Sequence, residues 1–152
     1  MTKKPYSAIS IANYFVKKGI DTGAMVTPMK LQKLVYFAHG WFLSLSGGQP
    51  LIKEKIGAWP FGPVIGTVYK YYSAYAKKPI DRLVETDEEA IQDAQDIAVL
   101  DKIWDVYGQR TAIELSNLTH LEGNAWDKTY RMGHSHTIPN ELIKEDFDRM
   151  SE

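Results

Sequence analysis

"TPMKLQKLVYFAHGWFLSLSG", residues 27–47, is the stretch that decides the fold. Thr27 suits the N-cap of a helix, and Pro28 suits its first position, where a missing N–H group costs nothing. A helix that is apolar on two sides is normally packed between other elements, so this segment predicts a central helix. The apolar stripe contains Leu31, Leu34, Val35, Ala38, Phe42 and Leu45, the second apolar side contains Met29, Tyr36 and Leu43, and the strip expected to face water contains Lys30, Lys33, Gly40 and Ser44.

The rest of the chain predicts further helices and one small β element. A weak alternation over residues 51–59 and a second apolar run around residues 80–85 predict two short strands that pair. We expect a mainly α protein: a compact single-domain helical bundle over residues 1–152 with a small two-stranded β element. Capping residues and periodicity also predict six other helices. They run from Ser7 to Lys18, with Gly19 as the stop, from Pro63, from Thr86 to Tyr107, after Thr111, after Asn124 and from Pro139. In the last of these, Ile143, Phe147 and Met150 are expected to face inward.

The composition is that of an ordinary globular protein. Hydrophobic residues make up 44% of the chain and charged residues 24%, and no run of about 18 apolar residues suggests a membrane span. Cysteine is absent, which removes disulfides and thiolate chemistry. With no signal peptide recognisable at the N-terminus, these features predict a cytoplasmic protein without a membrane partner.

The net charge of −1 conceals an asymmetry between the two halves of the chain. Residues 1–80 carry 11 Lys and two acidic residues, whereas residues 81–152 carry seven Lys/Arg and 17 Asp/Glu. A basic half raises nucleic-acid binding as an alternative function. Because no nucleic-acid-binding motif accompanies the charge, we expect the halves to fold together and neutralise each other.

His39, in the middle of the central helix, is the first candidate for catalysis. A general base needs an orienting acid or a nucleophile within hydrogen-bond reach, and a helix places such partners three or four residues away. None of those neighbours of His39 is a carboxylate. We therefore expect a structural histidine that donates to a backbone carbonyl or a hydroxyl.

His120, Glu122, His134 and His136 are the candidates for a metal site. His120 and Glu122 have the wrong spacing for one helix face, and a polar surface loop explains the two later histidines equally well. No nucleophile elbow, phosphate loop or dinucleotide fingerprint is present. The sequence predicts no catalytic residue, no metal and no cofactor, with a histidine- or metal-dependent enzyme as the less favoured alternative.

The aromatic residues indicate a contact surface. Trp59 and Phe61 flank Pro60 in a turn that cannot bury every side chain. The run of residues 69–72, YKYY, covers several faces of its helix, so Tyr69 or Tyr72 should be partly exposed. Aromatic groups on rigid supports are common anchors of protein interfaces. The predicted binding surface contains Trp59, Phe61, Tyr69, Lys70 and Tyr72.

Three segments together resemble a bacterial family, the Panacea-domain antitoxins, which are SocA-like or GepA-like and often prophage-associated. The segments are MKLQKLVYFAHGWFLSLSG (residues 29–47), IGAWPFGPVIGTVY (residues 56–69) and LSNLTHLEGNAWDKTYR (residues 115–131). Their order and spacing also fit, over roughly residues 7–147. Ala125 departs from the pattern, since relatives often have proline before the tryptophan. The resemblance implies structural roles for His39, Gly40, Trp41, Gly62, Pro63, His120 and Trp126. We expect Gly62 to adopt an unusual backbone angle and Pro63 to begin a helix. Trp41 and Trp126 are expected to pack in the core.

The resemblance implies an antitoxin that neutralises a cognate protein toxin by direct binding, the toxin usually being encoded beside it. It implies no catalytic residue. An alternative from the same family is a proteolytic adaptor that delivers the toxin to an ATP-dependent protease. The toxin's identity and the oligomeric state are left open.

Overall fold

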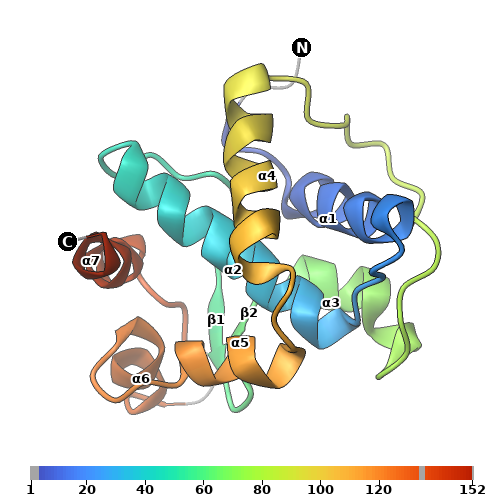
Figure 1. Cartoon of the computed structure of the whole chain (residues 1–152). Helices are drawn as coiled ribbons and strands as arrows, with labels where there is room; N and C mark the ends of the chain where they lie inside the picture. Colours follow the sequence, from blue (N-terminus) through green and yellow to red (C-terminus); the bar gives the residue numbers. More distant parts are fainter. Residues whose placement is uncertain (1–3, 134–135, 152) are drawn as a thin grey trace.

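A computed structural model describes residues 4–133 and 136–151 of the protein. Helix α2 (Pro28–Leu45) lies at its centre (Figure 1). Thr27 Oγ1 accepts the Lys30 N–H at its start, as the sequence predicts. At its end the Gly48 N–H donates to the Leu43 carbonyl at 2.8 Å, and Gly47 has φ 72°. This left-handed turn ends the helix in the manner of a Schellman motif.

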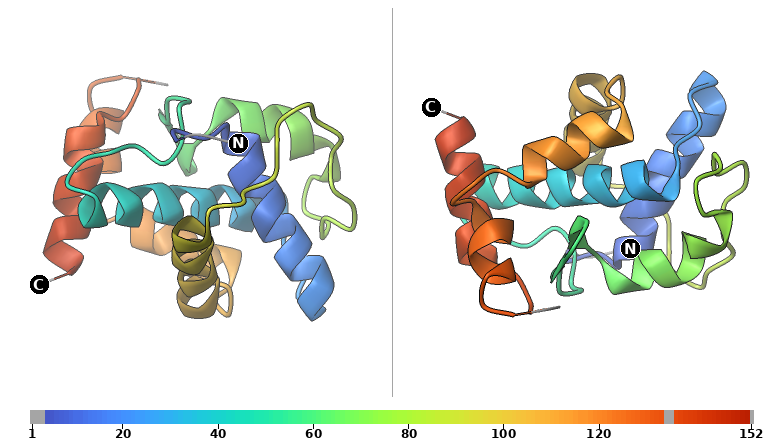
Figure 2. Two further views of the ribbon diagram at one scale, coloured as in Figure 1. Left: turned by 90° about the horizontal axis from the view of Figure 1, so that it is seen from above. Right: turned by 90° about the horizontal axis from the view of Figure 1, so that it is seen from below.

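The other elements surround α2 on several sides. Helices α4 and α5 lie on one side of it and the β1–β2 hairpin and α3 on the opposite side, while α1 crosses its N-terminal end and α7 packs across its C-terminal half (Figures 1 and 2). The prediction of a mainly α fold with a two-stranded β element is confirmed for the described residues. The elements are α1 (Ala8–Thr22), β1 (Gly57–Trp59), β2 (Gly62–Val64), α3 (Gly66–Tyr72), the 3-10 turn η1 (Ser73–Tyr75), α4 (Ala94–Tyr107), α5 (Ala112–Thr119), α6 (Ala125–Tyr130) and α7 (Asn140–Met150).

Gly40 is buried where α7 packs closely on α2, so the prediction that Gly40 faces water is wrong. A Cβ atom at Gly40 would lie 2.0 Å from the Phe147 ring. Trp41 contributes to the same contact, because its ring meets Phe147 edge to face and its indole N–H donates to the Tyr107 hydroxyl at 2.8 Å. The inward prediction holds for Ile143 and Phe147 but not for Met150, which is half exposed.

The second strand lies earlier in the chain than predicted. β1 pairs antiparallel with β2, with Trp59 opposite Gly62. Pro63 is therefore inside a strand, and the prediction that it begins a helix is wrong, because α3 begins at Gly66. Residues 80–85, the predicted second strand, instead run along the edge of the bundle, where the Ile80 N–H donates to the Val26 carbonyl at 2.7 Å.

Two further helix boundaries differ from the prediction. α1 continues past Gly19 and ends at Gly23, whose φ is 73°. α4 begins after Asp93, whose side chain accepts the Asp96 N–H, rather than at the capping box predicted from Thr86. None of the helices within the described ranges is long and apolar enough to cross a lipid bilayer.

Candidate functional site

Four of the five predicted binding residues meet at one groove. The groove has a volume of about 360 Å³ and lies between the first turns of α2, the β1–β2 hairpin and α3. The hairpin leads directly into α3, and both elements pack against α2, which places these aromatic residues around one groove. We call this site the aromatic groove and define it by Met29, Lys33, Trp59, Phe61, Val68, Tyr69 and Tyr72.

Phe61 and Tyr69 are the exposed parts of the aromatic groove. The Phe61 side chain is 71% exposed at the tip of the hairpin, and Tyr69 is 51% exposed on α3. Trp59 is partly buried beside Tyr69, with the two ring centroids 5.2 Å apart in an edge-to-face contact. Large aromatic groups held in this way are the kind of anchors that interfaces use.

Tyr72 and Lys70 do not extend this exposed surface. Tyr72 is only 1% exposed, so it forms the floor of the groove and is not free to bind a partner. Its hydroxyl donates to Asn13 Oδ1 at 2.6 Å and accepts the Val84 N–H at 2.9 Å. Lys70 is exposed beside Tyr71, on a face of α3 outside the groove. Helical spacing alone could not distinguish the buried tyrosine from the exposed one.

Lys33 supports the hairpin from below, so its predicted exposure to water is wrong. The side chain is 1% exposed, and its Nζ donates to the carbonyls of Phe61 at 3.1 Å and Pro63 at 3.2 Å. Burial lowers the pKa of Lys33 to about 8. The periodicity of α2 could not reveal this role, because both acceptors are backbone atoms of a distant hairpin.

Gly62 fits into the small space above Lys33. Its φ of 112° is one that side-chain-bearing residues rarely adopt, which is the backbone angle expected of it. A Cβ atom there would lie 2.8 Å from Lys33 Nζ and 3.2 Å from both His120 Nε2 and Thr119 Oγ1. The tip of the hairpin is thus held close to α2 and the end of α5.

Gln32 fixes the chain where the hairpin leads into α3. Its side-chain oxygen accepts the Ile65 N–H at 2.9 Å, and its Nε2 donates to the Ile65 carbonyl at 3.2 Å. Gln32 and Lys33 therefore fasten both ends of β2 to one turn of α2. Neither role was predicted from the sequence, although two long polar side chains in the most apolar helix were a signal that could have identified them.

His120 packs as part of the scaffold beneath the hairpin. Its ring lies 4.4 Å from that of Trp126, and the Trp126 indole N–H donates to the Trp59 carbonyl at 2.8 Å. Burial and the nearby Lys33 charge lower the pKa of His120. Its Nε2 atom is buried without a hydrogen-bond partner among the described residues.

His39 links three parts of the chain and is 1% exposed. The Ile52 N–H can only donate, so it places the acceptor at His39 Nδ1, 3.4 Å away, and the proton on Nε2. Nε2 then donates to Asn140 Oδ1 at 3.0 Å. The partners are thus a side-chain amide and a backbone N–H rather than the predicted carbonyl or hydroxyl. Burial lowers the pKa of His39, which favours a neutral structural ring.

The possible metal ligands do not come together in the described ranges. No group of three or more His, Asp or Glu side chains there could hold an ion. His134 lies outside the described residues, and His136 is exposed.

The described part of the chain is thus a small helical domain with an aromatic groove, and the two histidines considered for catalysis, His39 and His120, are packed within it. Residues 31–127 match the family described as "Antitoxin SocA-like, Panacea domain". Over 138 residues the chain is 31% identical to "Antitoxin SocA" of Caulobacter vibrioides (strain NA1000 / CB15N), covering 84% of this chain and 73% of that protein. The chain belongs to the SocA-like Panacea antitoxin family. No solved structure matches it.

Proposed function

We propose that the protein is an antitoxin that neutralises a cognate protein toxin by binding it directly through the aromatic groove. Family membership supports the antitoxin role. The observation that carries the choice of surface is that Phe61 of the hairpin and Tyr69 of α3 both line one groove and are 71% and 51% exposed. Exposed apolar clusters of this kind mark interaction sites.

The groove is built to present its aromatic residues in a fixed arrangement. Lys33 and Gln32 hold the backbone of residues 61–65 by four hydrogen bonds, so the backbone that carries Phe61 loses little conformational freedom when a partner binds. Preorganisation of this kind lowers the entropic cost of binding. In the proposed mechanism the toxin's active site, or the path of its substrate, is occluded by this rigid surface.

The test is co-expression with the product of the adjacent gene. The wild-type protein should restore growth and co-purify with that product. Replacing both Phe61 and Tyr69 by alanine should weaken the complex by about 30-fold or more and abolish rescue, because central aromatic anchors carry most of an interface's binding energy. Tyr71→Ala is the matched control, since Tyr71 is an exposed tyrosine of α3 outside the groove. Rescue by the double variant at wild-type strength would contradict the proposal.

Occlusion also predicts a constant amount of toxin. A pulse-chase experiment should show the toxin persisting, bound and inactive, in cells that express both proteins. Loss of the toxin only when an ATP-dependent protease is present would support the adaptor alternative instead.

A further inference from the structure

A second groove lies on the other side of the molecule from the aromatic groove. Helix α4 lies in front of α2 in Figure 1, on the side of α2 opposite the hairpin. The groove runs between α4 and the C-terminal half of α2 and has a volume of about 410 Å³. We call it the α2–α4 groove and define it by Trp41, Leu45, Val99, Lys102, Ile103 and Val106.

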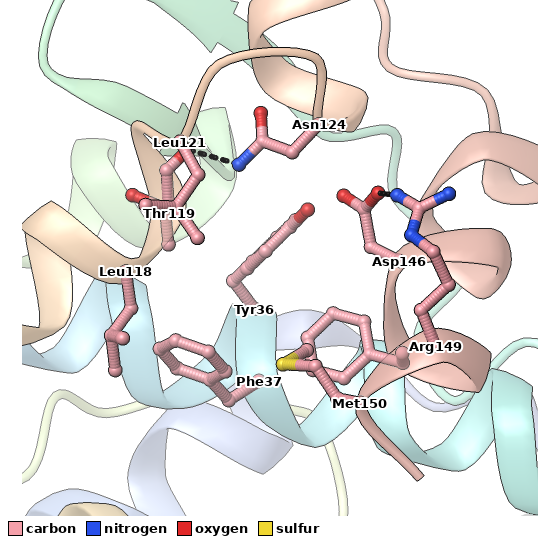
Figure 3. Close-up of a pocket in the computed structure, with 10 residues that line it drawn as sticks. Tyr36, Phe37, Leu118, Thr119, Leu121, Asn124, Asp146, Arg149 and Met150 are labelled. Carbon is pink, nitrogen blue, oxygen red and sulfur yellow. Dashed lines mark hydrogen bonds and ion pairs between the residues drawn. The ribbon is translucent and has the colours of Figure 1, made fainter. Parts of the chain in front are cut away.

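The α2–α4 groove contains a charge that the fold leaves unpaired. In a smaller pocket beside α7 the charges already meet, because Arg149 donates to Asp146 (Figure 3). Lys102, by contrast, is the one charged residue among the described residues that line the α2–α4 groove. It is exposed and forms no ion pair within residues 4–133 and 136–151.

An unpaired charge of the opposite sign lies next to Lys102 on the same face of α4. Asp105 follows three residues later, so the helix presents both side chains on one face. Asp105 is also exposed and has no ion pair in the described part of the chain. Asp96 and Asp101, on other sides of α4, pair with lysines of α1 and the segment before it. The fold therefore satisfies the inner charges of α4 and leaves one charge of each sign outside.

The apolar parts of this face are a projecting side chain and a hollow beside it. Leu45, the last residue of α2, is 69% exposed at the edge of the groove, and Val106 is 43% exposed on α4. Ala98, which also lines the groove, is small and exposed, so a second helix can approach closely there. Exposed apolar surface next to a groove is typical of an interaction site.

Each of these features has its complement on the same face, which is what a twofold dimer requires. In such an interface residue i of one copy meets residue j of the other, and j meets i. Two α4 helices that pack antiparallel, centred between residues 102 and 105, place Lys102 of each copy opposite Asp105 of the other. The same twofold keeps Leu45 of each copy on the side of the other copy's groove. We propose that the protein forms a homodimer through the α2–α4 groove and the outer face of α4.

A second copy fits this face better than an unrelated partner does. An unrelated protein would need only one charge or one apolar feature here, whereas both members of each complementary pair are present. The dimer would leave the aromatic groove open, because that groove lies on the opposite side of α2. The inference does not depend on the proposed function, since it concerns the protein alone.

The first test is the mass of the purified chain as a function of concentration. Standard interfaces bury about 800 Å² on each partner, whereas this face consists of one side of α4 and the end of α2, so we expect a dissociation constant on the order of 10–100 μM. Sedimentation velocity should give 17.3 kDa for the dilute protein and approach twice that value in concentrated samples. A monomer at about 1 mM, well above that constant, would overturn the inference.

A charge exchange tests the proposed pairing. Lys102→Glu and Asp105→Lys should each set like charges against one another and weaken the dimer by about tenfold or more. The two changes in one chain should restore the dissociation constant to within about threefold of the wild type, because opposite charges meet again. Lys78→Glu, the same change at an exposed lysine after η1, is the control and should leave dimerisation unchanged. Wild-type dimerisation in both single variants, or no recovery in the double variant, would overturn the inference.

A measurement on the wild-type protein covers unstable charge variants. The Trp41 indole N–H, bonded to the Tyr107 hydroxyl at 2.8 Å beside the groove, should show an NMR signal that shifts as the concentration rises. The Trp126 indole, bonded to the Trp59 carbonyl away from this face, should keep its signal. A constant Trp41 signal while the mass rises would place the dimer contact elsewhere and overturn the inference. A monomer whose Trp41 signal shifts only when the adjacent gene product is added would assign this face to the toxin, and would overturn it as well.

Discussion

Lys33 is a buried ammonium group whose acceptors are backbone carbonyls rather than a carboxylate. Burying a charge without a counter-ion is costly. The two carbonyls offset part of this cost and, in exchange, the amine fixes the tip of the hairpin. At the scale of the residue, the aromatic groove thus depends on a side chain that does not contact solvent.

The burial of the Lys33 amine should make the stability of the protein depend on pH in the alkaline range. Its pKa is about 8 in the folded protein against a usual value of 10.5, so the unfolded chain holds the proton more tightly. The contribution of Lys33 to the free energy of unfolding should therefore rise by about 1.5 kcal/mol between pH 8 and pH 9.5. Urea unfolding of the wild type and of Lys33→Met at pH 8 and pH 9.5 measures the difference between their free energies of unfolding at each pH. Titration of the tyrosines affects both proteins and cancels in this difference. A difference that does not grow with pH would contradict this assignment.

His39 should make the stability of the protein depend on pH in the acidic range. Its pKa is lowered in the folded protein, so the unfolded chain takes up the proton more readily. The stability associated with neutral His39 should be fully present above about pH 6.5 and should decline as the pH falls below that value. Urea unfolding at pH 7.5 and pH 5.0 should show a smaller loss for His39→Gln than for the wild type. His136→Gln, a change at an exposed histidine, should lose as much as the wild type.

At the scale of the element, local signals predicted the helices whose ends are held locally. Thr27 and Thr111 cap α2 and α5 as expected, because capping requires only atoms within three residues. Thr86 has the same pattern, yet it accepts the Glu88 N–H in a turn. The chain there is bonded to α1 instead, with Ser10 Oγ donating to the Glu89 carbonyl at 2.9 Å. A tertiary contact holds residues 86–89 out of the helix, and the N-cap that begins α4 is Asp93, a local signal seven residues further along the chain.

The contact of α2 with α7 offers a test at this scale. Gly40→Ala would place a methyl group 2.0 Å from the Phe147 ring carbon, so α7 must shift. We expect the free energy of unfolding to fall by at least about 1–3 kcal/mol, as in other overpacked cores. Gly66→Ala is the control, because a Cβ atom there meets nothing within 4 Å. Thermal unfolding should show a lower Tm for Gly40→Ala only, and equal values for the two variants would contradict this packing.

At the scale of the whole molecule, charges of the two halves pair within the fold. Lys4 and Lys18 of the basic half form ion pairs with Asp96 and Asp101 of α4 at 3.1 and 3.0 Å. Tyr6 and Tyr14 donate hydrogen bonds to the same two carboxylates. Part of the charge asymmetry therefore serves to join α1 and the segment before it to α4.

The candidate site was predictable in its residue types but not in its construction. Prolines and clustered aromatic residues led to the prediction of a contact surface with Trp59, Phe61 and Tyr69, and all three line one groove. Their meeting at one groove depends on Gln32 and Lys33, whose acceptors lie about 30 residues away in sequence.

Hydrogen–deuterium exchange of the purified complex with the adjacent gene product tests the central claim most directly. If the aromatic groove is the toxin-binding surface, amides of residues 57–64 and 66–72 should exchange more slowly in the complex than in the free protein. Unchanged exchange in both segments, with a complex formed and protection found elsewhere, would contradict the account.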